Sequence, residues 1–166
     1  MAGIGGRFGY NFSDHFALEA ESNFFPSDSE WEGGRKLQAV FGLKAGQRFD
    51  KVGLFVKARP GFVRYEKGDF QPKPGTACIT IFPPPVGCFV PVAQTNFAFD
   101  VGGVVELYPA KHTIVRFDAG DTIIRLQEHN AAVVLGIPNS ILPSVLPAPA
   151  KTTHNFQASA GFAFRF

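Results

Sequence analysis

Charged side chains recur at every second position in several segments of this chain, a spacing that places them on one face of an extended strand. Six cations and five anions share this pattern, so they could neutralise one another as ion pairs. Arg165 is one of them, and the other ten form a candidate internal charge network: Arg7, Glu19, Glu21, Lys44, Lys57, Arg59, Asp100, Glu106, Arg116 and Asp118. Such a face could line a polar passage or form a structural network.

Nucleophilic catalysis would need a hydroxyl or thiol within hydrogen-bond reach of a base such as histidine. Ser159 follows His154 by an odd number of positions, so a strand would place the two on opposite faces. His129 beside Glu128 is most simply a solvated loop residue. We therefore expect no catalytic residues, and a lipid-modifying enzyme is the least favoured alternative.

The two cysteines, Cys78 and Cys88, enclose a proline-rich segment that has the composition of a loop. Free thiols, a metal pair and a disulfide are the alternatives. No histidine or third cysteine lies near them, which argues against zinc. We expect no metal and no cofactor, and we expect a disulfide if the compartment is oxidising.

Seven segments alternate apolar and polar residues with a period of two, which is typical of β-strands with two different faces. They are longer than the ~5–6 residues of ordinary strands and close to the ~9–11 residues that span a bilayer. In the sixth, Asp118 and Asp121 differ in parity, and a bulge near Gly120 would reconcile them. The segments are Gly3–Phe12, Phe16–Phe24, Leu37–Arg48, Val52–Val63, Phe97–Tyr108, His112–Leu126 and Thr153–Phe166.

Short and long connections alternate between these strands. The short ones are Ser13–His15, Phe49–Lys51 and Pro109–Lys111, and the long ones are Phe25–Lys36, Glu66–Asn96 and Gln127–Thr152. Short turns at one end and long loops at the other are typical of an antiparallel up-and-down barrel of the outer-membrane type. The chain of 166 residues is expected to form one such domain, residues 1–166.

The composition favours a barrel with its charged face inside. The chain has 19 Phe and 18 Gly, and the glycines fall mostly on the charged face, where space inside a narrow barrel is scarce. Aromatic residues cluster near both ends of the strands, as in the girdles of membrane barrels. A soluble two-sheet sandwich is the alternative. Nucleic-acid binding is not expected, because 16 basic residues face 14 acidic ones without a basic run.

Inside such a barrel the charges would fill the available space. Eight strands leave room for side chains and little else, and buried charges must pair. We therefore favour a structural network over a narrow, porin-like passive pore.

The end of the chain carries a motif of its own: a polar residue, Gly, an aromatic residue and a final aromatic residue, in phase with the last strand. Ser159, Gly161, Phe164 and Phe166 fill these four positions. The motif resembles the C-terminal signature of bacterial outer-membrane barrels, and the whole pattern is similar to the eight-stranded outer membrane protein A and opacity-protein family. The resemblance implies recognition by the barrel-assembly machinery, contact with outer-membrane lipid and location in the bacterial outer membrane.

Seven strands are one fewer than the even number found in single-chain bacterial barrels. We expect a further strand upstream of Met1, or one supplied by something else. A strand hidden in Ala77–Val92 is the competing interpretation, although Pro83, Pro84 and Pro85 cannot donate ladder hydrogen bonds. A small disulfide-closed hairpin fits that segment better.

The two longest loops are rich in proline and in apolar residues, and they could form a cap over the barrel mouth or a docking surface for another protein. The candidate docking residues are Phe82, Phe89, Ile137, Ile141, Leu142, Val145 and Leu146. The favoured function is a structural anchor or receptor that presents extracellular loops.

Overall fold

The protein is all-β. The computed structural model describes residues 2–27, 33–75, 86–137 and 140–165, and all statements below concern these residues. They form nine strands and one short 3-10 turn, with no helix long and apolar enough to cross a membrane. The elements are β1 (Ile4–Asn11), β2 (Phe16–Phe25), β3 (Lys36–Arg48), β4 (Val52–Pro72), η2 (Val86–Cys88), β5 (Phe89–Ala110), β6 (Thr113–Leu126), β7 (His129–Ile137), β8 (Ser140–Ala148) and β9 (Lys151–Phe164).

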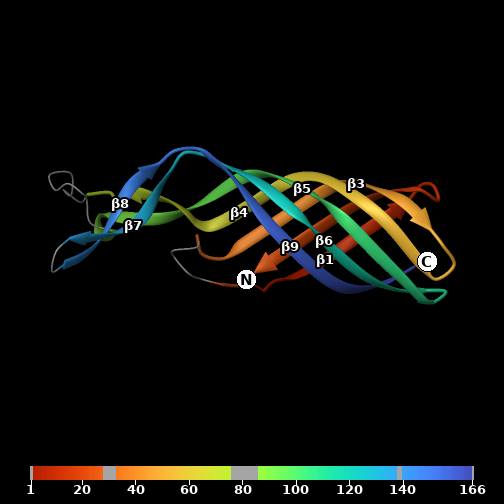
Figure 1. The fold of residues 1–166 in the computed structure, drawn as a ribbon. Coiled ribbons are helices and arrows are strands. Elements are labelled where there is room, and N and C mark those ends of the chain that lie inside the picture. The colour runs from red at the N-terminus through yellow and green to blue at the C-terminus, as the bar shows by residue number, and fades with distance from the viewer. Residues whose placement is uncertain (1, 28–32, 76–85, 138–139, 166) are drawn as a thin grey trace.

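Seven strands build one antiparallel sheet in the order β1-β2-β3-β4-β5-β6-β9, which curls into a half-barrel (Figure 1). The seven expected strands and the three short turns are confirmed. β1 and β9 are the edges of this sheet. Because six successive pairings are all antiparallel, β1 and β9 run in the same direction.

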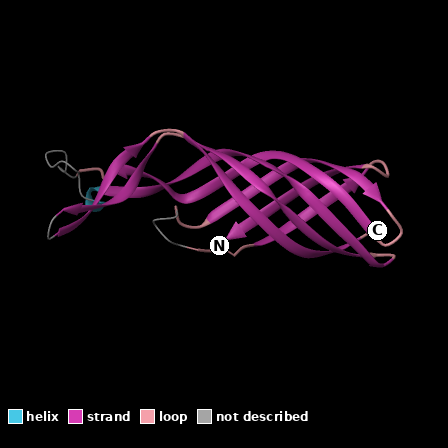
Figure 2. Cartoon of the chain, viewed as in Figure 1, coloured by secondary structure: helices cyan, strands magenta, loops and turns pink. Residues whose placement is uncertain are grey.

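The predicted loop over Glu66–Asn96 is wrong at both ends, because strands extend into it from either side. β4 continues to Pro72 and β5 already begins at Phe89, so the two strands project beyond the rest of the sheet (Figure 2). A break in the register between Tyr65 and Asp69 separates the projecting part from the main sheet. The period-two pattern is lost at this bulge, which is why the sequence suggested a loop.

The connection expected over Gln127–Thr152 is also not a loop. It contains the hairpin β7–β8, a separate two-stranded sheet that lies at the same end as the projecting β4–β5 hairpin (Figure 1). Two hydrogen bonds attach the base of this hairpin to β4. The backbone N–H of Asn130 donates to Asp69 Oδ1 at 2.8 Å, and the side-chain Nδ2 of Asn130 donates to the Phe70 carbonyl at 2.9 Å.

β6 is regular, and the bulge expected near Gly120 is absent from it. Its register with β5 is continuous from Phe97↔Arg125 to Leu107↔Val115, and that with β9 is continuous throughout. Asp118 and Asp121 therefore lie on opposite faces of the sheet. The first is buried on the concave face, and the second lies on the convex face among exposed apolar side chains.

Glycine allows neighbouring strands to approach on the concave face. Gly102 and Gly120 lie opposite each other in the β5–β6 ladder. A Cβ atom added at Gly102 would lie 2.3 Å from the Ala119 carbonyl oxygen and 2.6 Å from the Gly120 Cα. Since real Cβ contacts essentially never come this close, any larger residue would force the strands to shift and open the curl.

Candidate functional site

The burial pattern of this protein is the reverse of that of a water-soluble domain. Among the described residues, the largest fully buried side chains are all polar: Arg59, Gln38, Glu19, Asn96, Thr122 and Asp100. Large apolar side chains are exposed instead, and Phe8, Phe162 and Phe164 each leave about three quarters or more of their surface uncovered, at 74%, 82% and 75%. The charged face is therefore the inner one, as the sequence pattern indicates.

One half of the inner network is centred on Arg116. Its guanidinium binds Glu19, and it also lies 2.8 Å from Asp118 and 3.3 Å from Glu106. Lys44 Nζ bridges the two glutamates, at 3.1 Å from Glu19 Oε1 and 2.5 Å from Glu106 Oε1. Charge-assisted hydrogen bonds of this kind are the strong ones in proteins.

The other half is centred on Arg59, which is only 1% exposed. Its Nε and Nη2 both donate to Asp100 Oδ2, at 2.9 and 2.6 Å, and its Nη1 lies 2.7 Å from Glu21 Oε2. Lys57 Nζ lies 3.1 Å from the same Asp100 oxygen and 3.5 Å from Asp118 Oδ1, which joins this half to the first.

Arg7, on the edge strand β1, reaches across the concave side to the far half of the sheet. Its guanidinium lies 2.5 Å from Glu21 on β2 and 3.1 Å from Asp118 on β6. The ten charged residues expected on the inner face are thus connected in a single network. Five cations neutralise five anions, and no net charge remains.

Neutral polar groups extend the network toward the long-loop end, and sequence reasoning did not single them out. Gln38 Nε2 donates to Thr122 Oγ1 at 3.3 Å, and Thr122 Oγ1 donates to Asp100 Oδ1 at 3.4 Å. Gln157 on β9 donates to Gln38 Oε1 at 3.3 Å. Their position at the inward parity of their strands was the signal that could have identified them.

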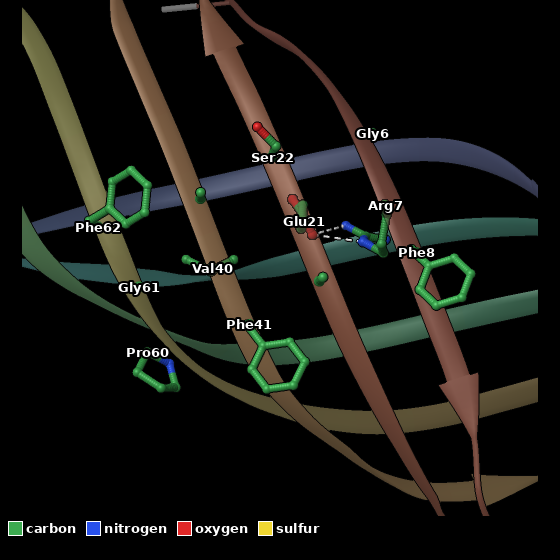
Figure 3. A pocket seen from close by; sticks show the side chains of 12 residues that line it. Gly6, Arg7, Phe8, Glu21, Ser22, Val40, Phe41, Pro60, Gly61 and Phe62 are labelled. Atoms are coloured by element: carbon green, nitrogen blue, oxygen red, sulfur yellow. Dashed lines mark hydrogen bonds and ion pairs between the residues drawn. The ribbon is translucent and has the colours of Figure 1, made fainter.

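The convex face carries a shallow apolar groove over β1–β4. Its volume is about 550 Å³. Figure 3 shows the rings of Phe8, Phe41 and Phe62 on the outer side of these strands, while the ion pair between Arg7 and Glu21 lies across the sheet from them. The floor of the groove is formed by small residues, among them Gly6 and Ser22.

A polar pair on the convex face was not foreseen. His154 Nδ1 on β9 lies 2.5 Å from Asp121 Oδ2 on β6, and the second carboxylate oxygen of Asp121 is buried without a hydrogen-bond partner among the described residues. His154 pairs with Ile123 in the β6–β9 ladder, so Asp121 is its diagonal neighbour on the same face. It ties the edge strand β9 to β6.

Tyr65 and Tyr108 lie near strand ends, where the sequence analysis expects girdles of aromatic residues, but both face inward. The Tyr108 hydroxyl donates to Glu106 Oε2 at 2.9 Å, and Tyr65 packs against the buried cluster of Val63, Ala98 and Ile124. Both have the inward parity of their strands, whereas Phe62 and Phe97 have the outward parity and are exposed.

The remaining predicted residues are placed as follows. Cys88 is buried in η2, and Cys78 lies outside the described residues, so the disulfide stays a prediction. Ser159 and Gly161 pair with Asp118 and Arg116 in the β6–β9 ladder, Phe164 ends β9, and Phe166 lies outside the described residues.

The candidate docking residues do not form one exposed loop. Phe82 lies outside the described residues, Phe89 begins β5, and Ile137, Ile141 and Leu142 belong to β7 and β8. Val145 is 3% exposed and Leu146 is half-buried, so Val145 offers no docking surface.

Within the described ranges, His, Cys, Asp and Glu form no group of three or more that could hold a metal ion. The network can hold β1–β6 in a curled arrangement and can block the passage of solutes along the concave face. In comparisons with known proteins, no protein-family model, no curated protein and no solved structure matches the chain.

Proposed function

We propose that the protein is a β-barrel of the bacterial outer membrane that serves as a structural anchor or receptor and presents its long hairpins outside the cell. The observation that carries this proposal is the reversed burial, with ion pairs inside and phenylalanines outside. In water the hydrophobic effect drives the opposite arrangement. A hydrocarbon solvent around the convex face removes the conflict.

The barrel is closed by one further strand between β1 and β9. These two edges run in the same direction, so one strand antiparallel to both completes an all-antiparallel cylinder of eight strands. In a bilayer every backbone polar group must be satisfied, which open edges cannot achieve. The assembly machinery reads the motif that includes Ser159, Gly161 and Phe164.

The anchor is favoured over the pore because the inner network is neutral and closely paired. Solute passage would require several buried ion pairs to separate at once. The presented elements are the β4–β5 and β7–β8 hairpins, which project at the long-loop end (Figure 2). A protein partner at this end and outer-membrane lipid at the convex face are the partners that this function requires.

The decisive experiment combines lipid flotation with gel mobility. Purified protein is mixed with phospholipid vesicles, floated on a density gradient and run on a gel with and without boiling. We expect flotation and a compact band that shifts on boiling. Protein that stays at the bottom of the gradient, is monodisperse without detergent and shows no shift would overturn the proposal.

Closure of the barrel is tested in the floated protein by amide hydrogen exchange. If a further strand pairs with both edges, the amides of β1 and β9 that point away from β2 and β6 exchange slowly. Fast exchange at these amides, with slow exchange in β3 and β4, would show that the sheet stays open.

A further inference from the structure

Two arginines lie on the convex face, near the long-loop end of the main sheet. Arg64 on β4 and Arg125 on β6 are both exposed. Each has the outward parity of its strand, since the residues that precede them in sequence, Val63 and Ile124, are buried on the concave side. The two guanidiniums are therefore separated by the sheet from the neutral charge network inside.

The register of the strands brings both arginines to one threonine. Thr95 on β5 pairs with Arg64 in the β4–β5 ladder, and Phe97, two positions further along β5, pairs with Arg125 in the β5–β6 ladder. Thr95 is therefore the direct neighbour of Arg64 and the diagonal neighbour of Arg125 on the same face. Cβ atoms of direct neighbours lie about 4.5–5.5 Å apart and those of diagonal neighbours about 7–8 Å apart, which long side chains can bridge.

The polar groups of this patch are available to a ligand. Among the described residues, the two guanidiniums and the threonine hydroxyl take part in no ion pair and no hydrogen bond. Two acidic residues of the same strands are engaged elsewhere, Glu66 with Arg35 at 2.6 Å and Asp121 with His154 at 2.5 Å. The patch therefore presents two uncompensated positive charges and one hydroxyl.

A phosphate group fits this set of donors. A guanidinium has five N–H donors in a planar fork and no acceptor, and the fork matches the oxygens of a phosphate. The hydroxyl of Thr95 can donate one more hydrogen bond. A phosphate above Thr95 can thus be bound by Arg64, Arg125 and Thr95 together.

Apolar rings cover the convex face next to the patch, on the side toward the middle of the sheet. Phe62 and Phe97 pair with each other in the β4–β5 ladder and are 42% and 56% exposed. Because β5 runs from the long-loop end toward the short turns, Thr95 lies nearer the long-loop end than Phe97. Donors for an acid group and an apolar surface follow each other in the same order as the headgroup and the hydrocarbon chains of a lipid.

We propose that this patch binds an anionic phospholipid of the surrounding leaflet. Arg64, Arg125 and Thr95 bind its phosphate group, and its acyl chains pack along Phe62 and Phe97. The inference rests on the proposed membrane function and deepens it, because it names the class of lipid and the place where that lipid binds. Each arginine near a membrane surface is expected to favour an anionic lipid by about fivefold.

The test is calorimetric titration of the full chain in micelles of a non-ionic detergent. The titrants are dihexanoyl phosphatidylglycerol, dihexanoyl phosphatidylcholine and inorganic phosphate, at the same ionic strength. Saturable binding of phosphatidylglycerol, at least about tenfold tighter than that of the other two, supports the proposal. No saturable binding, equal binding of phosphatidylcholine or equal binding of inorganic phosphate would each overturn it, the last by showing an anion site that does not use the acyl chains.

Matched variants locate the lipid. Arg64→Gln and Arg125→Gln should each weaken binding of phosphatidylglycerol by about fivefold or more. Thr95→Val keeps the charge of the patch and should weaken binding by about two- to tenfold, through loss of one hydrogen bond. Lys151→Gln removes a positive charge at the same end of the sheet. Lys151 precedes Thr152, the partner of Arg125 in the β6–β9 ladder, so it has the opposite parity and its loss should leave binding unchanged.

Equal losses in Lys151→Gln and in the arginine variants would mean that the lipid responds to total charge, which would overturn the assignment to this patch. Flotation separates the inference from the membrane proposal. Protein that floats and shifts on boiling, but binds phosphatidylglycerol no better than phosphatidylcholine, would overturn the lipid site alone. Protein that does not float, but binds phosphatidylglycerol through Arg64 and Arg125, would refute the membrane proposal and keep the lipid site.

Discussion

Arg59 shows, at the scale of a single residue, how buried charges affect the stability of the protein. Its guanidinium is almost completely buried and pairs with Asp100 and Glu21. Desolvation makes a buried ion pair a weak source of stability, but loss of one partner leaves a buried charge uncompensated. The network should therefore be more sensitive to imbalance than to the number of its pairs.

We predict that Arg59→Met lowers the free energy of unfolding by about 3–5 kcal/mol. Adding Glu21→Leu should restore part of this loss, because it returns the network to neutrality. Urea unfolding followed by circular dichroism in detergent measures both.

The matched control is Arg35→Met, which removes an exposed arginine from its pair with Glu66, where 52% and 46% of the two side chains are accessible. The expected loss is below about 1 kcal/mol. A double variant less stable than Arg59→Met alone would contradict the role assigned to charge balance.

At the scale of elements, the curl of the sheet depends on glycines that face each other across strands. Gly102 and its neighbour Gly103 provide a test within one strand. A Cβ at Gly102 meets the β6 backbone, whereas a Cβ at Gly103 meets nothing within 4 Å. The two positions differ in the face of the sheet on which they lie.

We predict that Gly102→Ala destabilises the protein by about 1–3 kcal/mol, because overpacking forces the strands apart. Gly103→Ala should be neutral or should stabilise by up to about 1 kcal/mol, since alanine reduces the freedom of the unfolded chain. The same urea titration compares them. Equal effects at the two positions would mean that strand approach does not limit the curl.

The strands and the inner charges could be predicted because a period of two is imposed by the backbone itself. Arg7, Glu19 and Arg59 were assigned to one face on parity alone, and parity holds wherever pairing is regular. The projecting parts of β4 and β5 could not be predicted, since a bulge and the prolines Pro72 and Pro91 interrupt the pattern.

A cavity of about 360 Å³ at the long-loop end, lined among others by Tyr65, Gln94 and Asn155, could not be predicted for a related reason. Its residues come from six strands that meet beside the bulge of β4, and no local sequence pattern indicates that they do. The prediction for Asp121 was wrong because it assumed a bulge near Gly120 that would turn this side chain to the inner face. β6 has no such bulge, and Asp121 lies on the convex face beside His154.

At the scale of the whole molecule, substitutions on the convex face can test whether that face contacts lipid or water. Phe41 is 57% exposed in the middle of β3, and Phe49 is 55% exposed in a short turn. The two side chains are about equally exposed, but in a bilayer they would lie at different depths. A charge would then destabilise the protein more at Phe41 than at Phe49, whereas in water the two substitutions should have similar effects.

We predict that Phe41→Arg destabilises the vesicle-inserted protein by about 2–4 kcal/mol, while Phe49→Arg changes it by about 0–1 kcal/mol. Urea titration in vesicles gives both values. If Phe41→Arg leaves stability unchanged and improves solubility without detergent, the convex face is exposed to water.

The span of the charge network also sets the order in which the molecule can form. Arg7 meets Asp118 across 111 positions of sequence, and Glu19 meets Arg116 across 97. An early hairpin of β1 and β2 can therefore pair Arg7 with Glu21, but Glu19 still lacks its partners on later strands. Contacts so distant make folding slow, because the entropy of closing the intervening chain must be overcome first. The sheet is expected to acquire its curl and its stability together in one late, cooperative step.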